Sequence, residues 1–442
     1  MRISSYPART KKRDASSKSR KLSVALNIIR VLPAAVLLLA VLSCSKQTNV
    51  PSLPEPTGPY GVGSARFSFV DSTRPETFTP DPNDFREVAF RVWYPALKTS
   101  CTKRVPYMEK AEERKRSLPK GSPIPPAFFD SLGQLWSNSY YDGVLTGEVP
   151  TFPVVIYSPA YSAGMSASTV LMEELASHGY VAVSVGHAFE TSHFIRPDGT
   201  LRVFPLDNEE LRARGMERAA TAELQRGLNE TNDPARLRKL VRSITAARPK
   251  TLLSLRTWVE DIGFVIDRLE AMNTEGTFKD RLDLDHIGVI GHSFGGTAAG
   301  QACLDEPRCK AGINLDGLQL GGMLDQSLER PFMFVHHDNA GAANSLINLP
   351  FFESAQNTCY MVMVRGTRHL SFSDVSLPVF ARLTGLPAEA LGPINGLRAL
   401  AVTNDLVRSF FDRHLRGLPS PLLDNSSGEY PEVEMRFRTP GD

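Results

Sequence analysis

The feature that most constrains this chain is a serine flanked by glycines between a predicted strand and a predicted helix. The sequence Gly291-His292-Ser293-Phe294-Gly295 matches the pattern G-x-S-x-G. It follows a short apolar run and precedes a stretch of small, helix-compatible residues. A serine nucleophile on a sharp strand-to-helix turn needs this order, because small neighbours leave room for the turn. The pattern predicts a nucleophilic serine; the alternative is a glycine-rich loop with an ordinary helix-capping serine.

Short apolar segments that alternate with helical patterns predict the fold class. Strands are predicted over residues 65–70, 88–94, 153–157, 180–185, 287–290, 311–315, 332–335 and 360–364. The first two resemble an antiparallel hairpin, and the later ones are continuous runs typical of parallel strands buried on both faces. Helices are predicted over residues 168–177, 252–272 and 404–415. We therefore expect an α/β protein with a mostly parallel, doubly wound sheet and helices on both faces.

Residues 1–43 have the composition of a signal peptide. They contain nine Lys or Arg and one Asp, and they end in the apolar run 31–42. That run is short for a membrane span and suits a signal-peptide core. Small residues before Cys44 resemble a bacterial lipobox, so we expect an exported lipoprotein tethered to a membrane through Cys44, in the periplasm or at the cell surface. The alternative is an uncleaved anchor helix over residues 22–43.

The remaining chain suggests one catalytic domain with two flanking segments. Residues 44–60 contain four prolines without periodicity and predict an extended tether. We expect a domain over residues 61–417 and a C-terminal tail over residues 418–442. Residues 205–250 are polar, charged and helical, and form either a solvated insertion or a cap over the active site. Beyond residue 43 the net charge is about −6, and no basic patch indicates a nucleic-acid partner.

The cysteines and metal-binding motifs leave few options for cofactors. Besides Cys44, the chain has four cysteines, of which Cys303 and Cys309 bracket a polar turn. An oxidising compartment would permit these two to pair, and the alternative is that all four are thiols. No C-x-x-C, H-E-x-x-H or P-loop pattern occurs. We therefore expect no cofactor and no metal.

Acyl transfer by a serine requires a histidine base. His369 follows the apolar strand 360–364, which places it at the carboxyl end of the last strand of the parallel series. His414 falls inside the last predicted helix and is expected at the surface. His336 and His337 come one strand too early. We therefore predict His369 as the base.

The acid and the oxyanion donors are less constrained by the sequence. Asp316 ends the strand 311–315 and Asp338 follows the next strand, so both lie at the carboxyl edge of the sheet. The spacing alone does not distinguish them. The backbone N–H of Phe294 should pair with an N–H from the loop 158–164, where Tyr161 is the best candidate.

At five places the sequence resembles the plasma-type platelet-activating-factor acetylhydrolase family. The motifs are Gly291-His-Ser-Phe-Gly-Gly, Gly312-Ile-Asn-Leu-Asp-Gly, Arg365-Gly-Thr-Arg-His, Leu175-Ala-Ser-His-Gly-Tyr and Arg91-Val-Trp-Tyr-Pro. The resemblance spans about residues 60–417 and implies the α/β-hydrolase fold. It implies a calcium-independent serine esterase or lipase that cleaves short-acyl lipid or phospholipid esters. It assigns the nucleophile to Ser293, the base to His369 and the acid to Asp316 rather than Asp338.

Two departures from that family leave the substrate open. Pro159-Ala160 stands where the family usually has His-Gly, and this loop resembles the Ser-Pro-Gly-Tyr type of bacterial cutinases and polyester hydrolases. The charged motif after residue 185 is replaced by Gly-His-Ala-Phe-Glu. A polyester or cutinase-like esterase, or an acyltransferase using the same residues, is therefore an alternative. A non-enzymatic alternative is an inactive surface lipoprotein that binds a lipid.

Overall fold

The computed structural model describes residues 52–118, 125–204, 209–228, 230–231, 233–338, 348–380, 388–424 and 428–440. Residues Pro51–Asp442 form one compact unit, and Met1–Val50 lie outside the described residues. The predicted signal peptide and Cys44 therefore also lie outside them. Across the described ranges, no helix is both long enough and apolar enough to cross a membrane.

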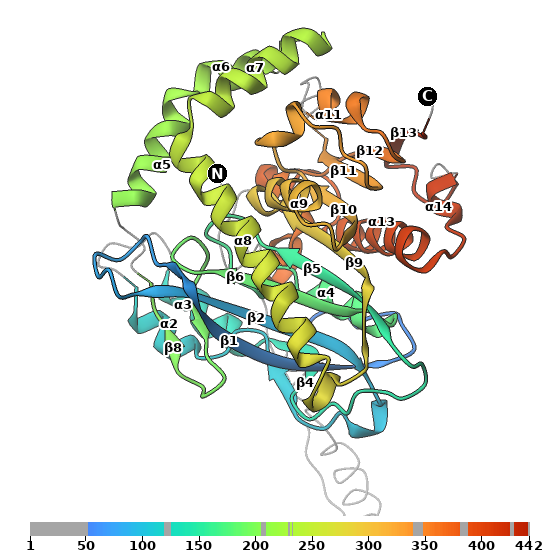
Figure 1. Ribbon diagram of the computed structural model, residues 1–442. Coiled ribbons are helices and arrows are strands. Elements are labelled where there is room, and N and C mark those ends of the chain that lie inside the picture. Colours follow the sequence, from blue (N-terminus) through green and yellow to red (C-terminus); the bar gives the residue numbers. More distant parts are fainter. Residues whose placement is uncertain are drawn as a thin grey trace, which may run out of the picture. The chain divides into compact units, whose positions relative to one another are not determined.

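A large twisted sheet runs through the domain (Figure 1). In the described residues it has eleven strands, in the order β13 (Val433–Arg438), β12 (Cys359–Val364), β11 (Phe332–His337), β10 (Cys309–Leu315), β9 (Leu282–His292), β5 (Phe152–Ser158), β6 (Val181–His187), β2 (Phe85–Ala96), β1 (Gly61–Pro75), β4 (Trp136–Tyr140) and β3 (Arg104–Pro106). Neighbouring strands from β6 to β12 are parallel, whereas β2 is antiparallel to both β6 and β1. β7 (Phe194–Ile195) and β8 (Leu201–Arg202) form a separate hairpin. This sheet confirms the predicted α/β-hydrolase architecture.

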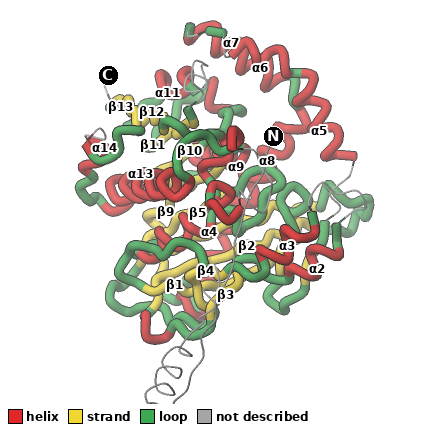
Figure 2. Tube along the Cα trace, turned by 180° about the vertical axis from the view of Figure 1, so that it is seen from behind, coloured by secondary structure: helices red, strands yellow, loops and turns green. Residues whose placement is uncertain are grey.

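Helices cover both faces of the sheet (Figures 1 and 2). The helices of the described residues are α2 (Ala111–Arg116), α3 (Pro126–Leu132), α4 (Thr169–Ser177), α5 (Glu209–Ala220), α6 (Ala222–Leu228), α7 (Pro234–Ala246), α8 (Pro249–Met272), α9 (Phe294–Asp305), α11 (Leu349–Ser354), α13 (Gly396–Arg416) and α14 (Pro421–Asp424). Short 3-10 turns span Lys98–Ser100, Gly276–Phe278, Gly322–Leu324, His369–Phe372, Asp374–Ser376 and Ala388–Ala390. α8 and α9 lie on one face, and α4 and α13 lie on the other.

The side chains on the two faces of each parallel strand pack into different cores, which explains the continuous apolar runs in the sequence. In β5, Val154 and Ile156 pack into the core that contains the buried side chains of α8 and α9. Val155 and Tyr157 point the other way, into the core that contains those of α4 and α13. Successive side chains of a strand alternate between faces, so a strand covered on both sides is apolar throughout.

The C-terminal segment is not a tail, which corrects the prediction for residues 418–442. It contains α14 and the edge strand β13, and β13 pairs antiparallel with β12. Val433 is buried and Met435 packs against the core, whereas the intervening Glu434 and Arg436 are exposed. A charged strand at the edge of a sheet blocks pairing with other chains. Because its charged residues interrupt the apolar run, this strand was not predicted from the sequence.

The described part of the predicted tether is packed against the domain. Leu53 is buried, and its N–H donates to the carbonyl of Trp136 at 2.9 Å. The N–H of Thr57 donates to the carboxylate of Glu174 at 2.9 Å. Residues 52–60 are therefore docked rather than extended, because their few donors and one large apolar side chain find partners on the domain. Residues 44–51 lie outside the described residues.

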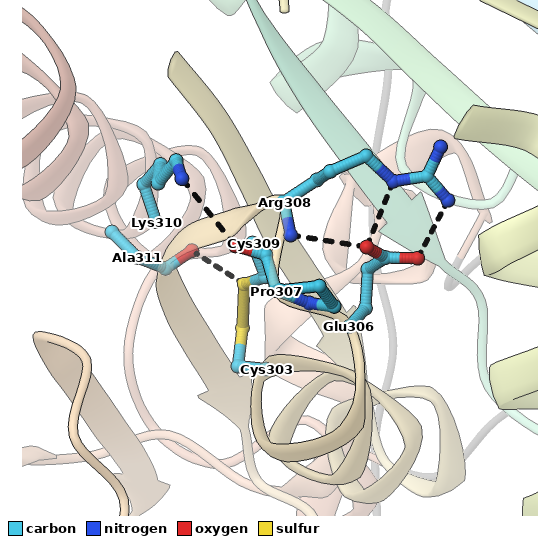
Figure 3. The surroundings of a disulfide bond; sticks show 7 residues. All are labelled: Cys303, Glu306, Pro307, Arg308, Cys309, Lys310 and Ala311. Carbon is cyan, nitrogen blue, oxygen red and sulfur yellow. Dashed lines mark hydrogen bonds and ion pairs between the residues drawn. A yellow bond between two sulfur atoms is a disulfide. The ribbon is translucent and has the colours of Figure 1, made fainter. Parts of the chain in front are cut away.

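Two of the cysteines form a disulfide, as one of the two sequence hypotheses proposed. Cys303 at the end of α9 is bonded to Cys309 at the start of β10 (Figure 3). In the turn between them, the guanidinium of Arg308 donates to the carboxylate of Glu306 at 2.8 and 2.7 Å. The other cysteines that the structure describes, Cys101 and Cys359, are free thiols.

Candidate active site

Ser293 occupies the turn between β9 and α9, and its backbone is held in a conformation that residues with a side chain rarely adopt. Its φ and ψ are 57° and −121°. A Cβ atom on Gly291 would lie 2.1 Å from the carbonyl oxygen of Gly295, and one on Gly295 would lie 2.0 Å from that of Ser158. Both distances are far inside van der Waals contact, so the turn requires glycine at each position. Ser293 therefore lies on the sharp strand-to-helix turn that the sequence predicts.

His369 lies in the loop after β12 and connects Ser293 to Asp316. Its Nε2 is 3.0 Å from the Oγ of Ser293, and its Nδ1 is 2.6 Å from Oδ2 of Asp316. Burial alone would lower the pKa of His369, but the hydrogen bond and the charge of Asp316 outweigh burial and raise that pKa. A proton on Nδ1 donated to the carboxylate leaves Nε2 as an acceptor for the serine hydroxyl.

Asp316 follows β10 and is the acid that contacts His369. Burial alone would raise the pKa of its carboxyl, but hydrogen bonds from His337 and His369 lower it well below its usual range. The N–H of His337 donates to Oδ1 at 3.1 Å, and Nδ1 of His337 lies 2.7 Å from Oδ2. Asp316 is therefore ionised at neutral pH and is held from two sides.

Asp338, the other candidate acid, is used differently. Its Oδ2 accepts the N–H of Gly366 at 2.8 Å, and its own N–H donates to Oγ1 of Thr367 at 3.3 Å. Its carbonyl also accepts a hydrogen bond from Arg368. These bonds fasten the loop just before His369, so Asp338 supports the loop while Asp316 contacts the imidazole.

The three other histidines downstream of Ser293 lie in different environments. His337, which comes one strand earlier than the expected base, bonds to Asp316. His336 is buried, and desolvation lowers its pKa to about 4. His414 lies in α13, as expected, and is half-buried against Tyr360, with 3.3 Å between its Nε2 and the phenol oxygen. The sequence signal for His337 was its place at the end of β11, beside β10.

The two predicted oxyanion donors border the same cavity as Ser293. Phe294 is the first residue of α9, so its N–H has no acceptor within the helix. Tyr161 lies in the loop after β5, with its ring centroid 5.9 Å from that of Phe294. Trp258 of α8 stacks on the ring of Tyr161 with centroids 6.1 Å apart. The aromatic contacts hold the loop next to the start of α9.

A second serine–histidine–aspartate chain, unforeseen from the sequence, lies beneath this loop. Oγ of Ser158 is 3.0 Å from Nε2 of His187, and Nδ1 of His187 is 2.9 Å from Oδ2 of Asp261. All three residues are fully buried, and Arg86 donates to Asp261 at 2.7 Å. Because no substrate can reach this serine, we interpret the chain as a support for the end of β5, where the loop with Tyr161 begins.

The cavity above Ser293 has a volume of about 280 Å³ and is bordered partly by the helical insertion. Arg214 and Arg218 from α5 and Gln225 from α6 form part of its wall. Arg238 of α7 ties the insertion to the domain by donating to the carbonyls of Leu324 and Pro350 at 3.0 and 3.2 Å. Of the two sequence hypotheses, this position favours a cap over a solvated insertion.

Asp316, His337 and His369 also resemble a metal-binding set. One ligand atom from each lies within 4.8 Å of the others. Both imidazole Nδ1 atoms, however, are already hydrogen-bonded to the carboxylate. A cation between them would have to displace these bonds, so the donor set fits a hydrogen-bonded chain better than a metal centre.

Comparisons with known proteins agree on a hydrolase of esters. A family model described as platelet-activating factor acetylhydrolase, isoform II, matches residues 43–419. The platelet-activating factor acetylhydrolase of Bos taurus is 22% identical over 87% of this chain and 82% of its own length. A probable 1-alkyl-2-acetylglycerophosphocholine esterase of Arthroderma benhamiae is 20% identical over 91% of this chain and 99% of its own. A solved ferulic acid esterase from Streptomyces cinnamoneus superposes with a TM-score of 0.67 at 26% identity, covering 87% of this chain and 99% of the esterase.

Proposed function

Because the chain belongs to the platelet-activating factor acetylhydrolase, isoform II, family and is a carboxylic ester hydrolase, we propose that it cleaves short-acyl esters of lipids or phospholipids. The observation that carries this proposal is the continuous hydrogen-bonded chain from Ser293 through His369 to Asp316 at the wall of the cavity. The cavity volume of about 280 Å³ is large enough for a short acyl group. An inactive lipid-binding lipoprotein is inconsistent with the family and its esterase relatives.

In the proposed mechanism, Ser293 is the nucleophile. Nε2 of His369 takes the hydroxyl proton as Oγ attacks the ester carbonyl, and ionised Asp316 stabilises the imidazolium that forms. The N–H groups of Phe294 and Tyr161 donate to the carbonyl oxygen as it becomes negative. His369 then gives its proton to the leaving alcohol, and an acyl-serine ester remains.

The second half of the reaction releases the acyl group. His369 removes a proton from water, the hydroxide oxygen attacks the acyl carbonyl, and Oγ of Ser293 leaves with the proton that His369 returns. If another alcohol entered in place of water, the same steps would transfer the acyl group to it. An acyltransferase is thus distinguished from a hydrolase only by the acceptor.

We also propose that the protein is an exported lipoprotein anchored through Cys44. The support is the basic segment, the apolar run and the small residues that precede Cys44. The Cys303–Cys309 disulfide agrees with an oxidising compartment. A diacyl anchor would hold the catalytic domain near lipid substrates.

A panel of acyl esters with a fluorophosphonate probe tests the enzymatic proposal. We expect wild-type protein to react with the probe and to prefer acetyl and propionyl esters over octanoyl and longer ones. Ser293→Ala should lose both labelling and turnover, whereas Ser72→Ala, at an exposed serine of β1 outside the cavity wall, should retain both. Products formed in the presence of glycerol would identify acyl transfer. Labelling of Ser293→Ala at the wild-type rate would contradict the assignment.

A further inference from the structure

The cavity that contains Ser293 carries an excess of positive charge. Arg214, Arg218 and Arg248 all border it. The only carboxylate in its wall is that of Asp316 among the described residues, and two histidines already bond to it. Arg214 donates to the carbonyl of Lys250 at 3.2 Å and pairs with Glu190 at 3.3 Å, so it is tied into the fold. Arg218 and Arg248, in contrast, form no ion pair with a carboxylate of the described residues.

Arg248 is a buried cation for which the described residues supply no counter-ion. Only 4% of its surface is exposed. Nε donates to Oγ1 of Thr221 at 2.7 Å, and Nη2 donates to the same neutral oxygen. Burial, followed by the positive charge of Arg218, lowers its pKa below the ordinary value of arginine. Buried arginines are normally paired with an anion, because desolvation of an unpaired charge is costly.

Glu217, an acid whose charge acts on Arg248, forms its hydrogen bonds elsewhere. Its carboxylate accepts the N–H groups of Lys250 and Thr251 at 2.7 and 2.9 Å and the hydroxyl of Thr251 at 3.0 Å. It therefore caps the start of α8. Its charge favours protonated Arg248, yet the net effect on the pKa of Arg248 is still a decrease. Among the described residues, the hydrogen bonds of Glu217 thus go to the start of α8, and none of them reaches Arg218 or Arg248.

Arg218 connects this charge to the proposed reaction centre. Its guanidinium carbon lies 5.5 Å from the centroid of the Tyr161 ring, and the Tyr161 N–H is a proposed oxyanion donor. No carboxylate of the described residues forms an ion pair with Arg218. Arg218 is exposed on α5, whereas Arg248 lies at the junction of α7 and α8. Both side chains therefore come from the insertion and its boundary, which Figure 1 shows beside α8.

We propose that Arg218 and Arg248 form a subsite for an anionic group carried by the ester substrate. The planar guanidinium groups suit two-point hydrogen bonding to a carboxylate or a phosphate. An anion there would supply the missing counter-ion of Arg248 and relieve its repulsion from Arg218. This inference rests on the proposed ester hydrolysis at Ser293 and defines the charge of the preferred ester.

Small esters of different charge test the subsite in the full-length enzyme. The neutral reference is butyl acetate, the anionic esters are 4-acetoxybutanoate and 3-acetoxypropyl phosphate, and acetylcholine is the cationic control. Monoethyl glutarate places the carboxylate on the acyl side. We expect kcat/KM for at least one anionic ester to exceed that of butyl acetate about tenfold or more, and the ratio to fall as salt increases, because salt screens charge. The order of kcat/KM among the anionic esters shows whether the subsite prefers a carboxylate or a phosphate.

Matched arginine variants decide whether these residues cause the preference. Arg218→Gln and Arg248→Gln should bring the anionic-to-neutral ratio of kcat/KM toward one. Arg236→Gln removes the same charge from an exposed position on α7 outside the cavity wall, and should leave the ratio unchanged. If Arg248→Gln does not fold, Arg218→Gln alone decides, because its side chain is exposed.

Two outcomes separate this inference from the proposed function. A wild-type enzyme that hydrolyses butyl acetate and is labelled at Ser293 but shows no preference for any anionic ester overturns the subsite alone. The same holds if the preference survives unchanged in Arg218→Gln. Failure of wild-type protein to hydrolyse any of the esters or to react with a neutral fluorophosphonate contradicts the proposed function instead.

Discussion

His337 bonds to Asp316 twice, through its backbone N–H at 3.1 Å and through Nδ1 of its ring at 2.7 Å. The carboxylate that orients His369 is therefore anchored by a second histidine from the neighbouring strand. The backbone contact fixes the position of the carboxylate, and the ring contact adds a hydrogen bond to its negative charge. This arrangement makes Asp316 a rigid support for the proposed base.

The two candidate acids should respond differently to the same substitution. Asp316→Asn should lower kcat/KM by about 10⁴-fold, because an amide does not hold the required tautomer of His369 or stabilise its charge. Asp338→Asn should have a much smaller effect, since Asp338 bonds to the loop before His369. Kinetics on acetyl esters compare the two. A larger loss in Asp338→Asn would show that the acid follows the next strand.

Removing the second histidine should have a moderate effect. His337→Ala removes the ring contact to Asp316 but leaves the backbone N–H, and we expect kcat to fall about tenfold with little change in KM. One hydrogen bond to a charged group contributes about 1.5 kcal/mol, which corresponds to about one order of magnitude in rate. Steady-state kinetics with circular dichroism as a folding control measures this. An unchanged kcat would mean that the ring does not support Asp316.

The rate should depend on pH through His369. A general base acts when neutral, so activity should increase as the pH rises through the pKa of His369. The hydrogen bond and charge of Asp316 raise that pKa. The acidic limb of the pH–rate profile should therefore have its midpoint above the ordinary pKa of a histidine. In Asp316→Asn the limb should shift to lower pH, because the negative charge that favours the imidazolium is lost. A limb that does not move in this variant would contradict the pairing.

The membrane anchor can be tested separately from catalysis. Cys44→Ser should abolish metabolic labelling with a fatty acid and either block processing or release the protein from the membrane fraction. Turnover of a water-soluble ester by the solubilised variant should be unchanged. If the variant stays in the membrane with residues 1–43 still attached, an uncleaved anchor helix would be the better explanation.

Much of the fold and the strand-to-helix turn that holds Ser293 could be predicted because their signals are local. The strand before Ser293, the two glycines and the helix after it lie within one short segment, and their packing leaves no room for a side chain at Gly291 or Gly295. The apolar parallel strands were equally visible, since burial on both faces leaves no alternation to interpret. β13 was missed because an edge strand keeps its charged residues.

The features that the sequence did not decide depend on contacts between distant segments. Asp316 and Asp338 both follow a strand, and only the path of the loop before His369 separates the residue that contacts the imidazole from the one that supports the loop. His337 depends on the parallel pairing of β10 with β11. Arg218 and Arg248 look like ordinary charges of a polar insertion until the cavity brings them together.

The most direct test of catalysis by Ser293 is to identify the covalent acyl-enzyme. Wild-type protein should be mixed with an activated acetyl ester, quenched in acid within milliseconds to seconds, and analysed by peptide mass spectrometry. We expect one acetyl group on the peptide that contains Ser293. This group should be absent in Ser293→Ala and should accumulate only slowly in His369→Ala. Rapid turnover with the acetyl group on another residue, or full turnover by Ser293→Ala, would contradict catalysis by Ser293.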